Sequence, residues 1–382
     1  MSMSALLLQE EVFRYSRHLL IPEVGLEGQR RLKSTSVLII GAGGLGSPVS
    51  LYLAAAGIGH IGLVDDDVVE ASNLQRQVIH DTPHLGQPKV ESARERLTAL
   101  NPFIQVDAIC DCFNDQTAER IASGYDILVD CTDNFSTRYL INDLCVLTGR
   151  PDVYGAIFRF EGQVSVFDAH RGPCYRCIFP EAPPPELSPS CSEAGVLGVI
   201  PGVIGSLQAT EVIKVALGIG SPLYGKLILY DGLDESFQTL KLAKQPECLV
   251  CGQHPQITRL EESGHFCQDE EFIPISDAEK ISPTELDTLM KSPVPPILID
   301  VRTPVEQQVS RITGAISIPY EQLSNHLNEL DRQREMVVFC RVGKRSARAL
   351  DLLRKAGFEH VRHLAGGINA WVEQVSPESF QY

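Results

Sequence analysis

Hydrophobic and polar positions in the first part of the chain alternate between two patterns. Short apolar runs at residues 37–40, 61–64 and 127–130 predict buried strands. Helical patterns at residues 46–56 and 88–100 lie between these runs. Strands that alternate with helices in this way predict a doubly wound α/β domain, Rossmann-like, with a mainly parallel sheet.

The pattern changes after residue 155. Residues 164–167 alternate in a way that suits antiparallel strands, and residues 203–217 predict a helix. Residues 254–275 are polar and acidic and contain few apolar runs, so they are expected to form a linker. The first domain, residues 1–253, is therefore expected to carry an antiparallel extension.

A second strand–helix series begins near residue 276. Apolar strands are predicted at residues 297–300 and 336–339, the first of them preceded by a proline-rich stretch. The 107 residues from 276 to 382 fit one small α/β domain. We therefore expect two α/β domains joined by a linker.

Composition and charge argue against several classes of function. Lys and Arg number 33 and Asp and Glu 49, which gives a net charge of −16. This balance argues against a nucleic-acid partner and against a polybasic membrane anchor. The hydrophobic fraction of 43% is that of a globular protein. No apolar run is expected to span a membrane and no signal peptide is recognised, so a cytoplasmic protein without a membrane partner is expected.

A glycine-rich loop follows the first predicted strand. Gly41, Gly43 and Gly46 match G-x-G-x-x-G between a strand and a helix, and Gly44 lies in the same loop. Asp65 follows Gly46 by 19 residues, at the end of the next strand, where a carboxylate can accept hydrogen bonds from ribose hydroxyls. A tight turn without a ligand is the alternative. The motif alone does not separate ATP from NAD, so an NAD-dependent Rossmann dehydrogenase stays open.

Charged residues beyond the loop favour ATP. Arg76 and Lys89 lie within 25 residues of Asp65 and could hold the β- and γ-phosphates while pyrophosphate leaves. Asp133 comes just after the strand at 127–130, on the side of the sheet that faces the ligand crevice, and could hold Mg²⁺. Each residue alone could be a solvated surface charge. Their arrangement indicates a nucleotide site.

Residues 8–253 resemble the bacterial E1-like adenylyltransferases that activate ubiquitin-like sulfur carriers, namely the molybdopterin-synthase and thiamine-carrier activating enzymes. The matching stretches are residues 14–18, 41–46, 64–67, 73–77, 87–92, 130–134 and 194–198. The resemblance implies that the C-terminal glycine carboxylate of a carrier attacks the α-phosphate of ATP. The products would be an acyl adenylate and pyrophosphate.

The resemblance also implies roles for single residues. Asp65 would bind ribose, Asp133 would serve Mg²⁺ and catalysis, and Arg17 would reach the nucleotide of a second subunit in a homodimer. Arg76 would act on the phosphates as a catalytic residue. The rest of the implied ATP site comprises Gly41, Gly43, Gly44, Gly46, Asp67, Asn73, Lys89, Asn134 and Arg138.

Eleven cysteines without a secretion signal predict reduced thiols that serve metal binding or chemistry. Cys174 and Cys177 form one C-x-x-C pair, and Cys248 and Cys251 form another. Two such pairs can complete a closed, structural Cys₄ zinc site. The 70 residues between the pairs leave two unrelated redox or core pairs as the alternative. The resemblance to the E1-like enzymes favours zinc.

Cys340 follows a predicted strand and precedes a helix that begins near Ser346. Backbone N–H groups, the helix dipole and nearby cations would stabilise a thiolate there. The expected sulfur loop comprises Arg341, Gly343, Lys344, Arg345 and Ser346. A phosphate-binding loop with an incidental cysteine and a buried inert thiol are the alternatives.

Residues 276–376 resemble a rhodanese domain. The matching stretches are residues 300–302, Glu306, residues 314–315 and residues 364–371. The resemblance implies that Cys340 carries a persulfide, supplied by an upstream donor such as a cysteine desulfurase. Residues 310–313 read Ser-Arg-Ile-Thr where the family usually has Gly-His-Ile-Pro.

Cys191 follows a proline-rich stretch, and a mobile loop would suit a thiol that visits the adenylate and then leaves. In the related enzymes this position carries a second thiol; an ordinary exposed loop cysteine is the alternative. The cysteines expected to be small core residues are Cys110, Cys112, Cys131 and Cys145.

The two modules together predict one continuous process. The first domain would adenylate the C-terminal glycine of a ubiquitin-like carrier that ends in Gly-Gly. The Cys340 persulfide would then convert the acyl adenylate to a thiocarboxylate for molybdenum cofactor, thiamine or tRNA thiolation pathways. A module that docks carriers and senses sulfur without catalysis is the other alternative.

Overall fold

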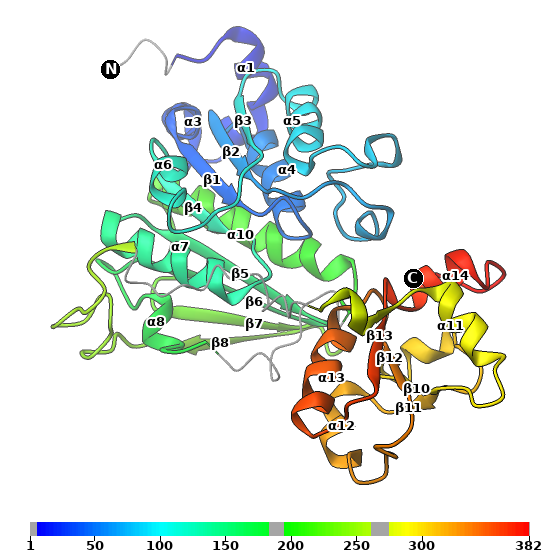
Figure 1. The fold of residues 1–382 in the computed structure, drawn as a ribbon. Helices are drawn as coiled ribbons and strands as arrows, with labels where there is room; N and C mark the ends of the chain where they lie inside the picture. The colour runs from blue at the N-terminus through cyan, green and yellow to red at the C-terminus, as the bar shows by residue number, and fades with distance from the viewer. Residues whose placement is uncertain (1–5, 183–194, 261–274, 382) are drawn as a thin grey trace. The chain divides into compact units, whose positions relative to one another are not determined.

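The computed structural model describes residues 6–182, 195–260 and 275–381. The chain forms two compact units, Met1–Gln268 and Asp269–Tyr382, and each is built on its own sheet (Figure 1). The division between the units falls inside the predicted linker, most of which lies outside the described residues.

The larger sheet is mainly parallel with an antiparallel extension, as the sequence predicted. Its strand order is β3-β2-β1-β4-β5-β6-β7-β8. The parallel strands are β1 (Ser36–Ile40), β2 (His60–Val64), β3 (Gln105–Ile109), β4 (Ile127–Asp130) and β5 (Asp152–Phe158). The strands that continue it in antiparallel fashion are β6 (Glu161–Phe167), β7 (Lys226–Asp231) and β8 (Ser236–Lys241).

Apolar residues of the central strands face both ways, because helices cover both faces of the sheet. Val37 and Ile39 of β1 pack into a core with α4 and α10, whereas Leu38 and Ile40 pack into a second core with α6 and α7 (Figure 1). The helices of this unit are α1 (Gln9–Arg14), α2 (Ser16–Leu19), α3 (Gly25–Ser34), α4 (Gly46–Ala56), α5 (Lys89–Leu100), α6 (Ala118–Ala122), α7 (Phe135–Thr148), α8 (Tyr175–Ile178) and α10 (Val199–Leu217), with short 3₁₀ turns η2 (Ala71–Asn73) and η3 (Thr82–His84).

The strand order reverses between β1 and β4. From β1 the chain adds β2 and β3 on one side, and it then crosses to add β4 and β5 on the other. Ligands of such sheets bind outside the carboxyl ends of the strands at this switch point. The glycine loop follows β1 and Asp133 follows β4, so the topology brings both to the same crevice.

Helix α10 corrects one expectation. It begins at Val199, four residues before the predicted start at 203, and is long and apolar enough to cross a membrane by length and composition. It packs against α4 and against strands β5 and β6 (Figure 1). Its Gln208 is fully buried. These contacts are those of a core helix in a doubly wound domain.

The smaller unit has a parallel sheet with strand order β11-β10-β12-β13-β9. The strands are β9 (Lys280–Ile281), β10 (Ile297–Asp300), β11 (Ile316–Ser317), β12 (Met336–Phe339) and β13 (Val361–Leu364). The helices are α11 (Pro283–Met290), α12 (Tyr320–His326), α13 (Lys344–Lys355) and α14 (Gly367–Gln374), with 3₁₀ turns η6 (Asp277–Glu279) and η7 (Glu306–Gln308). Helices α12 and α13 cover one face and α11 and α14 the other, so this unit is also α/β.

Candidate functional site

The glycine loop connects β1 to α4 through backbone that only glycine can follow. Gly41 has φ +99°, and a Cβ there would lie 2.7 Å from the carbonyl oxygen of Cys131. A Cβ on Gly46 would lie 2.0 Å from the carbonyl oxygen of Gly41. The loop is therefore held close to the end of β4, and the N-terminus of α4 opens directly from it.

Asp65, which directly follows β2, connects the glycine loop to the acidic residues after that strand through hydrogen bonds. Its carboxylate accepts hydrogen bonds from the backbone N–H of Ala42 at 2.8 Å and of Asp67 at 2.9 Å. Lys89 is buried at the start of α5, with its Nζ 2.6 Å from Asp67 Oδ2 and 3.8 Å from Asp65 Oδ1. Burial raises the pKa of Asp65, and the Lys89 ammonium partly opposes that rise.

Arg76 lies over the glycine loop. Its Cγ would be 3.5 Å from a Cβ on Gly44, and its Nη1 donates to the carbonyl of Ser72 at 3.1 Å. Asn73 is buried one turn earlier, where its Oδ1 accepts from the backbone N–H of Glu70. The structure therefore brings Arg76 to the loop, and it uses the Asn73 side chain to close the η2 turn.

Two residues of this region had no predicted role. His80 is buried, with Nε2 3.1 Å from the Ala42 carbonyl and Nδ1 3.0 Å from Ser92 Oγ. Burial lowers the pKa of His80, so a neutral ring can donate to the loop and accept from Ser92. Gln77 is also buried, and its Oε1 lacks a hydrogen-bond partner among the described residues. Its amide lies 3.7 Å from a Cβ on Gly43, so an unmatched acceptor borders the loop.

Asp133 and Asn134 follow β4 and are both exposed at the crevice. Asn134 is the N-cap of α7, because its Oδ1 accepts from the Thr137 N–H at 2.8 Å. Arg138 is buried beneath them. Its Nε lies 3.2 Å from Asp130 Oδ2, and its Nη2 donates to the Thr132 carbonyl at 3.0 Å. The structure thus gives Arg138 a supporting position under the strand end.

Arg17 lies on α2 and is exposed. Within residues 6–182, 195–260 and 275–381, no hydrogen bond or ion pair links Arg17 to the glycine loop, so its role at a second subunit's nucleotide stays a prediction.

The four predicted zinc ligands meet in one place. The Sγ atoms of Cys174, Cys177, Cys248 and Cys251 lie within 4.8 Å of one another. Separations of 3.5 Å between Cys174 and Cys248 and 3.4 Å between Cys177 and Cys251 approach the spacing of about 3.8 Å set by tetrahedral Zn–S bonds of about 2.3 Å. The donor set is all sulfur and mostly buried, so it fits a closed structural zinc site.

The turn that carries the first cysteine pair is anchored to α7. Arg176, between the two cysteines, makes a bidentate ion pair with Asp143 at 2.7 Å for both nitrogens. The backbone N–H of Tyr175 donates to Asn142 Oδ1 at 2.7 Å. Because Asp143 and Asn142 lie on the helix capped by Asn134, the metal centre and the crevice share one structural support.

Cys340 directly follows β12 and is buried, and its sulfur faces the rest of the loop. The backbone N–H of Gly343, at φ +111°, lies 3.1 Å from its Sγ, and Ser346 Oγ lies 3.6 Å from it. Helix α13 begins at Lys344, so its N-terminal end points at the thiol. The Gly366-Gly367 turn packs on the backbone of Cys340, where a Cβ on Gly367 would lie 2.5 Å from the Cys340 carbonyl oxygen.

The cations of the sulfur loop differ in their surroundings. Arg345 is buried and pairs with Glu306, with 2.7 Å between Nη1 and Oε2, so its charge is balanced inside the domain. Burial raises the pKa of Glu306, but hydrogen bonds from Arg345 and Thr303 outweigh it and lower the pKa to about 2. Lys344 is exposed and Arg341 is half-buried. Lys344 and Arg341 are therefore the loop cations nearest to solvent.

The remaining cysteines separate into two kinds. Cys131 and Cys145 are buried, as expected of small core residues. Cys110 and Cys112 are exposed, so the prediction that they belong to the core is wrong. They follow β3, which is an edge strand of the sheet and has no neighbour to cover its end. Cys191 lies outside the described residues.

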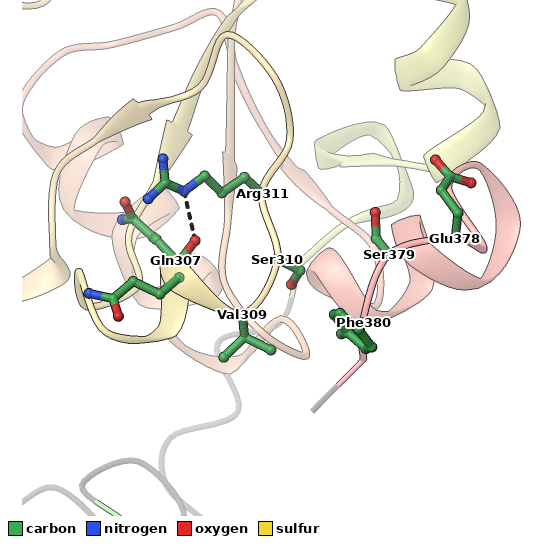
Figure 2. A pocket seen from close by; sticks show the side chains of 8 residues that line it. Gln307, Val309, Ser310, Arg311, Glu378, Ser379 and Phe380 are labelled. Atoms are coloured by element: carbon green, nitrogen blue, oxygen red, sulfur yellow. Dashed lines mark hydrogen bonds between the residues drawn. The ribbon is translucent and has the colours of Figure 1, made fainter.

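A shallow pocket of about 460 Å³ lies in the smaller unit, between the segment after β10 and the C-terminal segment (Figure 2). It is lined by Gln307, Gln308, Val309, Ser310, Arg311, Glu378, Ser379 and Phe380. It includes part of the stretch in which the chain departs from the rhodanese pattern. None of the predicted sulfur-loop residues lines it, so the pocket is separate from the Cys340 loop.

Family models match both units. The ThiF family matches residues 15–250, and the Rhodanese-like domain matches residues 282–374. The probable adenylyltransferase/sulfurtransferase MoeZ of Mycobacterium tuberculosis is 46% identical, over 98% of this chain and 96% of that protein. The adenylyltransferase and sulfurtransferase MOCS3 of Mus musculus is 40% identical, over 99% of this chain and 89% of that protein.

A solved structure, E. coli MccB with ATP, aligns with a TM-score of 0.55 and 27% identity, over 63% of this chain and 73% of that one. Together with the two family models and the full-length relatives, this similarity leads to one assignment. The chain belongs to the ThiF family and is an adenylyltransferase and sulfurtransferase that also carries a rhodanese-like domain.

Proposed function

We propose that this enzyme adenylates the C-terminal glycine of a ubiquitin-like sulfur carrier that ends in Gly-Gly, and then replaces the activated oxygen with sulfur carried by Cys340. One observation carries the proposal. A single chain holds a glycine loop with Asp65, Lys89 and Asp133 around it, and also a cysteine whose sulfur accepts a backbone N–H in a strand-to-helix loop.

In the adenylation step, the carrier carboxylate attacks the α-phosphate of ATP and pyrophosphate leaves. Backbone N–H groups at the start of α4, together with Arg76 and Lys89, would balance the negative charge that develops. Asp65 would accept hydrogen bonds from the ribose hydroxyls once it is free of Ala42. Asp133 would hold Mg²⁺, which neutralises phosphate charge when bound.

In the sulfur step, the terminal sulfur of a Cys340 persulfide attacks the acyl adenylate and AMP leaves, which gives an acyl disulfide between carrier and Cys340. The Cys191 thiolate then attacks Cys340 Sγ. This attack releases the carrier thiocarboxylate and forms a Cys191–Cys340 disulfide, which a two-electron thiol reductant reopens. Gly198 lies close to the Gln75 backbone, next to Arg76, where a Cβ on Gly198 would lie 2.1 Å from the Gln75 carbonyl oxygen.

The proposal extends to a zinc ion, a second subunit and a sulfur donor. Cys174, Cys177, Cys248 and Cys251 would hold zinc as a structural ion. The enzyme would act as a cytoplasmic homodimer in which Arg17 reaches the partner's nucleotide. A persulfide donor such as a cysteine desulfurase would reload Cys340.

Carrier-dependent exchange of radiolabelled pyrophosphate into ATP tests the first step. We expect exchange with a candidate carrier that ends in Gly-Gly and none with the same carrier lacking its last glycine. Pyrophosphate exchange at the same rate with and without the carrier would contradict the proposal. Tight binding of NADH without binding of ATP in a fluorescence titration would also contradict it. No AMP formation with any such carrier would favour a docking module instead.

A further inference from the structure

His363 reaches the sulfur loop from a neighbouring strand. It lies on β13, which pairs with β12 and therefore runs beside the strand that leads into Cys340 (Figure 1). Its Nδ1 lies 3.1 Å from Ser346 Oγ, and its Cε1 would lie 3.2 Å from a Cβ on Gly343. Ser346 and Gly343, which lie beside His363, also contact the sulfur of Cys340.

The Ser346 hydroxyl carries one proton but faces three possible hydrogen-bond partners. Its Oγ lies 3.1 Å from the Gly343 carbonyl oxygen, 3.1 Å from His363 Nδ1 and 3.6 Å from Cys340 Sγ. A hydroxyl donates one hydrogen bond, and a carbonyl oxygen or a thiolate can only accept. If Nδ1 also accepted, two acceptors would be left facing a serine oxygen that has no proton for them. If Nδ1 donates instead, the serine proton is free for the sulfur or the carbonyl.

The ring is suited to this donor role. His363 and Ser346 are both buried, so water does not compete for their hydrogen bond. Burial lowers the pKa of His363 to about 4, with Lys280 on the adjacent β9 adding to the effect, so the ring is neutral at neutral pH. A neutral imidazole carries one proton, and the contact with Ser346 favours its placement on Nδ1.

We propose that His363 is a positioning residue for sulfur loading: it donates from Nδ1 to Ser346 Oγ and thereby directs the serine proton to the Cys340 thiolate. The inference rests on the proposed use of Cys340 as the sulfur acceptor. In the loading reaction with thiosulfate, the thiolate attacks the outer sulfur, the S–S bond of thiosulfate breaks, and sulfite leaves with the electron pair. A serine proton held toward Sγ stabilises the attacking thiolate at neutral pH.

The test is the pH dependence of Cys340 alkylation by iodoacetamide in the full chain, followed by mass analysis of the peptide that contains Cys340. We expect Ser346→Ala to shift this profile upward by about one pH unit, the size of one hydrogen bond to a charged group. His363→Phe is expected to give a similar upward shift, with about tenfold slower alkylation below the new midpoint. Charged neighbours such as the Arg345–Glu306 pair are unchanged in both variants.

Three further variants separate positioning from simple loss of structure. His363→Asn places an amide donor near the Nδ1 position and is expected to restore most of the wild-type profile. Val361→Ala, two residues earlier on the same buried strand, removes packing but no hydrogen bond, and is expected to leave the profile unchanged. The double variant S346A/H363F is expected to shift no further than Ser346→Ala alone, because His363 acts through Ser346.

A downward shift in His363→Phe would overturn the proposal, because it would mean that the ring competes with the sulfur for the serine proton. Additive shifts in the double variant would also overturn it. The alkylation profile needs neither carrier nor ATP. A failure of the proposed function would instead leave the profile intact while Cys340 supplied no sulfur to a carrier, so the two failures are distinguishable.

Discussion

The glycine loop after β1 and the cysteine loop after β12 are both strand-to-helix connections at the carboxyl ends of parallel strands, but their surroundings differ. In the glycine loop, the absence of side chains at Gly43 and Gly44 leaves backbone bordered by Gln77 and Arg76. In the cysteine loop, the Gly343 N–H turns inward onto the chain's own sulfur.

The residues around each helix N-terminus determine which kind of ligand the loop suits. The first loop stands beside the carboxylates of Asp65 and Asp67 with Lys89 between them, which suits a ligand that brings both hydroxyls and phosphates. The second loop is enclosed, with Cys340 buried against Ser346, which suits a single atom bonded to the protein. The same dipole can thus serve a diffusible nucleotide or a covalent sulfur.

Substitution of Cys340 is expected to remove the sulfur-transfer activity and to leave the adenylation activity intact. Cys340→Ala should abolish thiocarboxylate formation, because no other residue is proposed to deliver the sulfur, while carrier-dependent pyrophosphate exchange continues at the wild-type rate. Mass spectrometry of the carrier and an exchange assay measure the two outcomes. Cys112→Ala, which alters an exposed thiol outside both loops, is the matched control and should retain both activities. Thiocarboxylate formed at the normal rate by Cys340→Ala would contradict the role of Cys340 in sulfur transfer.

Asp133→Ala is expected to impair adenylation and to leave sulfur loading intact. The exposed carboxylate beside the crevice is expected to support the charge of the phosphates, so its removal should reduce pyrophosphate exchange by about 10²-fold or more. Loading of Cys340 from thiosulfate, measured as sulfite release, should not change. Asp234→Ala, an exposed acid in the β7–β8 turn, is the control. Equal exchange in the Asp133 variant and wild type would remove this residue from the site.

Loss of a predicted zinc ligand should affect the first unit alone. Cys248→Ser is expected to release the metal and lower the free energy of unfolding of that unit by about 4 kcal/mol, because metal-binding energy at a closed site is folding energy. Metal analysis and calorimetry of the full chain measure both effects. Cys110→Ser should retain the metal. Sulfite release at Cys340 should persist, and its loss would show that the two units depend on each other.

A smaller, pH-dependent effect is expected at the second loop. The pKa of Glu306 lies near 2, below its usual value of 4.5, so the ionised form stabilises the folded unit above pH 4.5 and this stabilisation is lost as pH falls toward 2. Glu306→Gln should therefore destabilise the unit by about 2–3 kcal/mol at pH 7 and by much less near pH 3. Denaturant unfolding at the two pH values measures this. An equal loss at both would refute the assignment.

The spacing of apolar residues predicted several helices and strands correctly. The bounds predicted for α4 and β4 are those observed, because apolar runs flanked by glycine or acidic residues leave little choice of start and end. The exposure of Cys110 and Cys112 was not predictable in this way. Their local sequence is compatible with a core, and only the position of β3 at the sheet edge exposes them.

Motifs pointed to the two loops and to the cysteine cluster, but not to the side chains that pack around them. Two C-x-x-C pairs and a G-x-G-x-x-G loop are local patterns that can be read in one dimension. The buried pairings His80–Ala42, Arg345–Glu306 and Ser346–His363 join residues 38, 39 and 17 positions apart. No spacing rule links such partners, because strand order and packing bring them together.

The intact mass of a Gly-Gly carrier, measured after incubation with the enzyme, ATP, Mg²⁺ and thiosulfate, tests the proposed adenylation and sulfur transfer together. We expect a carrier whose mass has increased by the exchange of one oxygen for one sulfur, and no such product when either ATP or thiosulfate is omitted. A carrier that stays unmodified, or that gains sulfur without ATP, would contradict it.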